Sequence, residues 1–155
     1  MREAKTTTFW LTKKNLKKNP SEGDLLIFQQ LKKLLQPYED RLEIRVPNPH
    51  HYELWTKDWV RLSARDHRPN NKKFQFAAIG IYDKKVSLHF HPMFIDRSIK
   101  DKLKIELKIL VAGVAVLHFK STLDDKVAAE LRDLFEIGWE CYKKLKFVRS
   151  ERIMY

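Results

Sequence analysis

The chain has one cysteine and four glycines among its 155 residues, and it lacks any long apolar run. Cys141 cannot form a disulfide within the chain, so a secreted, disulfide-stapled scaffold is not indicated. The glycines lie far apart, which argues against a glycine-rich phosphate-binding loop. No apolar segment follows Met1, and none approaches the ~20 residues needed to cross a bilayer. The sequence therefore predicts a cytoplasmic protein with no membrane span.

Basic residues outnumber acidic ones by 31 to 20, which gives a formal net charge of +11. Nearly half of this excess lies in residues 1–20, which we interpret as a basic N-terminal arm. Lysines interleaved with aromatic rings can contact phosphates and stack on bases, so a nucleic acid or another polyanion is one predicted partner. The candidate contacts are Trp10, Lys13, Lys14, Lys17 and Lys18. Salt-dependent binding of single-stranded RNA, lost when residues 1–20 are deleted, would test this.

A chain of this length is expected to form one domain, here over residues 21–150, with a short tail at 151–155. Ser21 is the predicted N-cap of a first helix, whose apolar residues keep helical spacing up to Pro37. A long closing helix is expected after Thr122, which we interpret as its cap. Its predicted inner stripe consists of Val127, Leu131, Leu134, Gly138, Tyr142 and Leu145.

Alternating apolar and polar residues predict the strands. They are expected at 42–46, at 52–62 where aromatic content favours a strand over a short helix, in a hairpin of 74–82 and 86–91 turning at 83–85, and at 111–120. A short helix is expected over 97–107, and Gly113 is expected to mark a bend or a close backbone approach. Because strands joined by a tight turn are antiparallel, the predicted fold class is α+β. We expect a mainly antiparallel sheet of four to five strands packed against N- and C-terminal helices.

The second arm of the hairpin carries its polar residues on one face. We expect the helices to cover the other face and to leave this polar face open, where a pocket would bind a small ligand or ion. The predicted lining residues are Trp55, Trp59, Tyr82, Ser87, His89, His91 and His118. Apolar Ile79 and Ile81, on one side of the first arm, would suit closure of an uncovered face by a second copy, so a homodimer is also expected.

His89 and His91 form a His-x-His pair on one strand face, a spacing that can offer two neutral nitrogens to a divalent metal, with His118 as a third ligand. No acidic residue lies at an obvious spacing to complete such a site, so the favoured alternative is that these histidines only form hydrogen bonds. His50 and His51 follow a proline-rich stretch. They are interpreted as a surface connector rather than as part of the same pocket.

Catalytic candidates are few. Cys141 lies beside the apolar stripe of the closing helix, where burial makes a thiol unreactive. Ser121 and Thr122 are better explained as helix caps than as nucleophiles. The sequence therefore favours a non-enzymatic binding role.

Three local patterns resemble the YdhG-like family of small bacterial domains of unknown function. They are the hairpin of 74–90, the segment Gly113 to Ser121, and the helix end Gly138 to Lys144. Together they span about half the chain, 74–148, and the resemblance implies one α+β domain without established catalytic residues. The tryptophan-containing segment that usually follows the first helix is replaced here by residues 45–51. Some family annotations mention iron handling, but the acidic ridge that frataxin-like iron chaperones use has no counterpart in so basic a chain.

Overall fold

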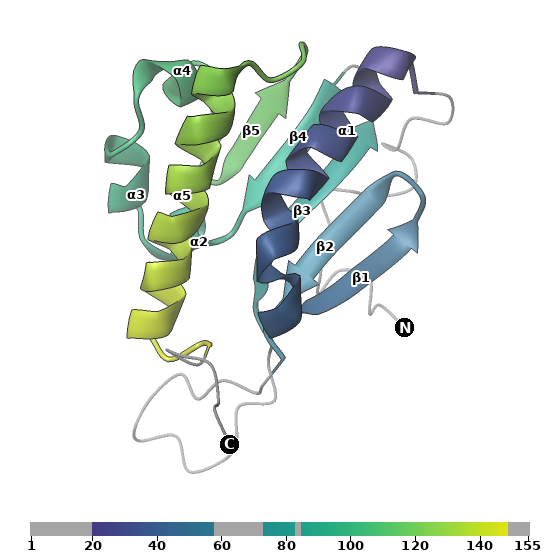
Figure 1. The fold of residues 1–155 in the computed structure, drawn as a ribbon. Coiled ribbons are helices and arrows are strands. Elements are labelled where there is room, and N and C mark those ends of the chain that lie inside the picture. Colours follow the sequence, from purple (N-terminus) through teal and green to yellow (C-terminus); the bar gives the residue numbers. More distant parts are fainter. Residues whose placement is uncertain (1–19, 58–72, 83–84, 149–155) are drawn as a thin grey trace.

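The computed structural model describes residues 20–57, 73–82 and 85–148. It contains one five-stranded antiparallel sheet, with two long helices, α1 and α5, lying across the same face (Figure 1). The strands follow in chain order as β1 (Glu43–Asn48), β2 (His51–Trp55), β3 (Gln75–Tyr82), β4 (Lys85–Phe90) and β5 (Val116–Phe119). The predicted α+β class is therefore confirmed, as are the hairpin of β3 with β4 and a strand at the start of 52–62.

Helix α1 (Glu22–Leu35) begins where the sequence predicts. The Asp24 N–H donates to Ser21 Oγ at 3.1 Å and the Ser21 N–H donates to Asp24 Oδ2 at 3.3 Å, which completes a capping box. A 3-10 helix, η2 (Gln36–Arg41), follows directly. Pro37 does not stop the chain from coiling there, because proline is tolerated in the first turn of a new helix.

Helix α5 (Asp125–Lys144) begins later than predicted. Asp124 is the N-cap, and its Oδ1 accepts from the Val127 N–H at 2.9 Å, so the assignment of Thr122 as the cap is wrong. Most of the predicted stripe is buried, but Leu145 lies past the helix end and is 43% exposed. The buried set also includes Phe135 and Trp139, which pack with the sheet and were not predicted.

Three single-turn helices connect β4 to β5: α2 (Pro92–Ile95), α3 (Ser98–Asp101) and α4 (Ile105–Lys108). The helix predicted over 97–107 is thus split into two turns. The strand predicted over 111–120 is also too long, since only its second half forms β5 and Val111 makes an isolated bridge to Leu117. Gly113 has a φ of 92°, in the left-handed region that favours glycine, and this confirms the predicted bend.

The first strand differs from its prediction in both extent and burial. It runs through Pro47 to Asn48 instead of ending at residue 46, because β1 is an edge strand and an edge tolerates a missing backbone donor. Ile44 is 46% and Val46 54% exposed, since β1 lies at the margin of the sheet beyond α1 (Figure 1). The expected half-buried strand is therefore an exposed edge.

Ile79 and Ile81 lie in the core instead of on an open face. They pair with Leu88 and Val86 and are fully buried with the residues under the helices. They offer no surface to a second copy, so this basis for a homodimer is wrong. Within the ranges given above, none of the helices has the combined length and apolar character of a bilayer-crossing segment.

Candidate functional site

The strand register places polar side chains in two rows on the face of the sheet opposite α1 and α5. Directly paired residues point to the same side of an antiparallel sheet, and so do residues two apart on one strand. The first row runs Arg45, Glu53, Ala78, His89, Val116, and the second runs Asn48, His51, Gly80, Ser87, His118. With Trp55, Gln75 and Tyr82, these residues form what we name the polar face.

The middle of the polar face is occupied by the smallest side chains. In both rows the central strand β3 supplies only Ala78 or Gly80. The strands on either side, β2 and β4, are about 10 Å apart, at the usual spacing of neighbouring strands. Because little stands between them, Glu53 and His51 from β2 can approach Ser87 and His89 from β4.

Glu53 is a buried carboxylate at the centre of this arrangement, only 1% exposed. The Trp55 indole N–H donates to Oε1 at 2.6 Å. His51 Nε2 lies 2.8 Å from Oε2, although the ring is not aligned for a hydrogen bond. The interpretation of His51 as a surface connector is wrong, since it is 3% exposed beside this carboxylate.

The sequence-based prediction missed Glu53. His51, Glu53 and Trp55 occupy alternate positions of one strand, so they share a face, and that spacing was the available signal. It was missed because the segment 52–62 was assigned to a strand on its aromatic content, without the alternation that begins at His51.

His89 and His91 are both neutral at pH 7. Burial lowers the pKa of each imidazole from 6.5 to about 4. The neighbouring His91 adds to this effect on the pKa of His89, whereas the negative Glu53 opposes it. The two ring centroids are 6.2 Å apart, and the His91 ring also stacks on Phe74 at 6.0 Å and on Phe94 at 5.4 Å. Aromatic packing thus holds one imidazole beside the other.

Ser87 links Tyr82 to His118. Its Oγ lies 3.0 Å from the Tyr82 hydroxyl and 2.7 Å from His118 Nδ1. Burial, followed by the charges of Lys85 and Lys120, lowers the pKa of His118. A serine beside an imidazole is a pairing found in nucleophilic catalysis, but the Ser87 hydroxyl is also hydrogen-bonded to Tyr82. The trio therefore acts as a set of hydrogen-bonding groups.

The three predicted metal ligands are not gathered into one metal-binding group among the described residues. Ser87 and His118 belong to one row and His89 to the other, and no group of three or more His, Cys, Asp or Glu side chains in the described part of the chain is arranged to hold a metal ion. His89 and His118 lie in neighbouring rows of the polar face, and the His91 ring lies beside His89 just after β4.

The remaining predicted residues divide into two groups. Trp55 lies on the polar face as expected, although it is 5% exposed and its indole is occupied by Glu53. Trp59 lies outside the described residues, as do the arm residues Trp10, Lys13, Lys14, Lys17 and Lys18. Burial raises the pKa of the half-buried Cys141, which agrees with the expectation of an unreactive thiol.

Comparison of the chain with models of protein families, with curated proteins and with solved structures finds no match. The resemblance of 74–148 to the YdhG-like family stays a prediction from the sequence.

Proposed function

We propose that the polar face binds a small, uncharged polar ligand without chemical conversion. The observation that carries this proposal is the pair of cross-strand rows, in which a buried carboxylate, a buried hydroxyl and neutral imidazoles surround Ala78 and Gly80. Buried polar groups cost free energy unless they are satisfied, and apolar residues would serve a purely structural sheet face better. Clusters of groups with displaced pKa values are enriched at binding and catalytic sites.

The chemistry of these groups selects the class of ligand. Neutral imidazoles and hydroxyls both donate and accept hydrogen bonds, so they suit a ligand with donors and acceptors close together. The negative charge of Glu53 would repel an anion at the centre of the face. A small heterocycle or amide, rather than a phosphate or carboxylate, fits this combination.

NMR spectroscopy of the full chain tests the proposal through the imidazole nitrogens. The probes are a fragment set of uncharged polar heterocycles and amides, and zinc chloride is a separate arm because neutral imidazole is the form that binds metals. We expect a heterocycle or amide to shift the imidazole resonances of His89 and His91. His89→Phe should weaken that binding at least about tenfold, since the ligand loses a hydrogen-bonding group at the centre of the face.

The matched control is His50→Phe, at a half-buried histidine in the turn before β2, which should bind as the wild type does. The proposal is wrong if no fragment shifts these imidazoles, or if His89→Phe and His50→Phe bind equally well. If only zinc shifts the His89 and His91 resonances, the ligand is an ion and the proposed class is wrong.

A further inference from the structure

The two edges of the sheet differ in how they are covered. Beside β5, the His118 N–H donates to the Leu110 carbonyl at 2.9 Å, and the Ala112 N–H donates to the Val116 carbonyl at 2.7 Å, so the segment before β5 covers that edge. Within the described ranges no strand lies beyond β1 at the other edge. An open strand edge is a template for pairing with another chain. Strand β1 is therefore the candidate interaction surface of this fold.

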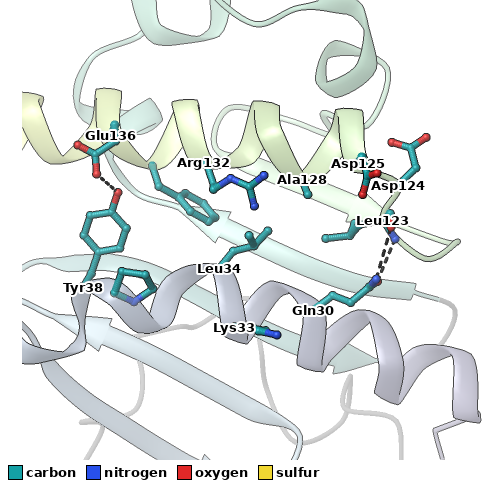
Figure 2. A pocket seen from close by; sticks show the side chains of 12 residues that line it. Gln30, Lys33, Leu34, Tyr38, Leu123, Asp124, Asp125, Ala128, Arg132 and Glu136 are labelled. Atoms are coloured by element: carbon teal, nitrogen blue, oxygen red, sulfur yellow. Dashed lines mark hydrogen bonds between the residues drawn. The ribbon is translucent and has the colours of Figure 1, made fainter.

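The helices also leave the side chains of β1 uncovered on their side of the sheet. Hydrogen bonds tie the α1–η2 segment to α5, since the Leu123 N–H donates to Gln30 Oε1 at 2.9 Å and the Tyr38 hydroxyl donates to Glu136 Oε2 (Figure 2). Helix α1 packs against β3 and β4, and β1 lies beyond it. Ile44 therefore remains about half exposed on the side of the sheet that holds the core.

The hydrogen-bonding pattern of the sheet turns the backbone of Ile44 outward. The Ile81 N–H donates to the His50 carbonyl at 3.2 Å, and the strand register places these two residues opposite each other. Because hydrogen-bonded pairs alternate along an antiparallel ladder, every second residue from His50 to Leu54 turns its backbone groups to β3. Ile44 lies opposite Leu54, so the N–H and C=O of Ile44 point away from the sheet.

The sequence of β1 is complementary to itself about Ile44. When two copies pair antiparallel with this residue at the centre, the outward backbone groups of the two isoleucines form a hydrogen-bonded pair, and Glu43 of each copy lies opposite Arg45 of the other. Opposite charges in directly opposed positions stabilise a strand pair. Within one copy Glu43 already contacts Arg45 at 2.6 Å and Lys73 at 2.8 Å, so the pairing extends this network across the axis, with one positive charge in excess per copy.

Two features of β1 keep such a pairing short. The register shifts between Arg45 and Asn48, and Pro47 has no backbone donor. Bulges and prolines limit pairing at a strand edge, here to the residues 42–46 around Ile44. A contact of this size is typical of weak and reversible association.

We propose that two copies of the chain join at β1, so that their sheets continue into each other around a two-fold axis at Ile44. Ile44 and Val46 of both copies then come together on the helical side, which removes from water the apolar side chains that α1 leaves exposed. The contact uses the same residues of each copy, as in most homodimers. A second copy is favoured over an unrelated peptide because the charge pattern of β1 matches its own reverse.

Sedimentation equilibrium of the full chain tests the association. Salt at about 0.15 M, where the Debye length is about 8 Å, screens most of the repulsion between two copies that each carry a charge of +11. We expect a monomer–dimer equilibrium between about 1 μM and 1 mM protein. Ile44→Lys should weaken it at least about tenfold, because two apolar side chains leave the contact and like charges then face each other. Ile105→Lys, at a 64% exposed isoleucine of α4, is the matched control and should associate as the wild type does.

Disulfide trapping tests the register of the pairing. Opposed residues in a hydrogen-bonded antiparallel pair have Cα atoms about 5.5 Å apart, a distance that a disulfide can span. Ile44→Cys should therefore give a covalent dimer when oxidised with copper phenanthroline. Val46→Cys lies on the same edge, but the two copies of this cysteine would be about 13 Å apart and should not link. The wild type, whose only cysteine is Cys141, is the blank.

Three outcomes would overturn this inference. They are a chain that stays monomeric over the whole concentration range, equal association of Ile44→Lys and Ile105→Lys, and equal trapping of Ile44→Cys and Val46→Cys. Circular dichroism checks that each variant is folded. The Ile44 side chain lies on the side of the sheet opposite the polar face, so these results are independent of the imidazole shifts that test ligand binding.

Discussion

Glu53 and His89 stand on either side of Ala78, each paired directly with it, on the face of the sheet that α1 and α5 do not cover. Glu53 is buried, and its negative charge partly offsets the lowering of the His89 pKa that burial causes. The carboxylate of one strand and the imidazole of another therefore share one environment. A change at either residue is expected to alter both the stability and the pH response of the polar face.

Replacement of Glu53 separates its charge from its hydrogen-bonding role. Glu53→Leu leaves the buried Trp55 N–H without its acceptor and His51 without its negative neighbour, so we expect a loss of about 2 to 4 kcal/mol in the free energy of unfolding. Glu53→Gln keeps an acceptor for Trp55 and should cost less than Glu53→Leu. Urea denaturation followed by tryptophan fluorescence measures both. Glu43→Gln, at a partly exposed ion pair with Arg45 and Lys73, is the control and should cost less than about 1 kcal/mol. A Glu53→Leu protein as stable as this control would contradict the prediction.

The stability of the protein is expected to fall in mild acid. The pKa values of His89 and His91 are about 4 in the folded state, below the ordinary value of 6.5, so unfolding takes up protons between these two limits. The contribution of each histidine is complete above pH 6.5 and is lost as the pH falls towards 4, about 3 kcal/mol per residue. Denaturation at a series of pH values measures the slope, and NMR titration of each ring measures its pKa. Native rings that titrate near 6.5 would refute this prediction.

Gly138 is required by the close approach of α5 to the sheet. A Cβ at this position would lie 2.3 Å from Phe90 Cζ and 2.9 Å from Pro92 Cγ. We therefore expect Gly138→Ala to destabilise the protein by about 1 to 3 kcal/mol, because the cost of overpacking exceeds the helical preference for alanine. In α1, Gly23→Ala meets only Ser21 Oγ at 3.7 Å and should be neutral or stabilising by up to about 1 kcal/mol. Thermal unfolding of both variants decides the matter, and equal shifts in their Tm would contradict the packing argument.

The position of the α5 cap is also open to a direct test. Asp124→Ala removes the side chain that accepts from the Val127 N–H, and it should cost about 0.5 to 2 kcal/mol. Thr122→Ala, at the residue that local sequence favours as the cap, should change the free energy of unfolding by less than about 0.5 kcal/mol. If chemical denaturation ranks these two variants in the opposite order, the helix begins where the sequence pattern places it.

The differences between prediction and structure have identifiable causes. Thr122 and Asp124 are both good cap residues, so local preference did not decide between them, and the contact of Leu123 with Gln30 of α1 accompanies the later start. The predicted first strand ended too early, at residue 46, because a proline usually ends a strand. A strand at the edge of a sheet can contain a proline, and the sequence did not show that β1 lies at the edge. His51 was assigned to the surface because its neighbours are turn residues, although its partners come from β2 and β3.

The spacing of apolar and polar residues along the sequence was enough to locate the central hairpin and the first helix. Alternation along 74–90 placed Ser87 and His89 on one side of a hairpin, and helical spacing with a capping serine located α1, because both signals arise within a few residues. Only the tertiary structure decided which side of the sheet the helices cover. Ile79 and Ile81 are part of the core because they lie on that side. The tertiary structure also brought Glu53 of β2 beside His89 of β4. The register between strands distant in sequence depends on packing over the whole sheet, and no local pattern encodes it.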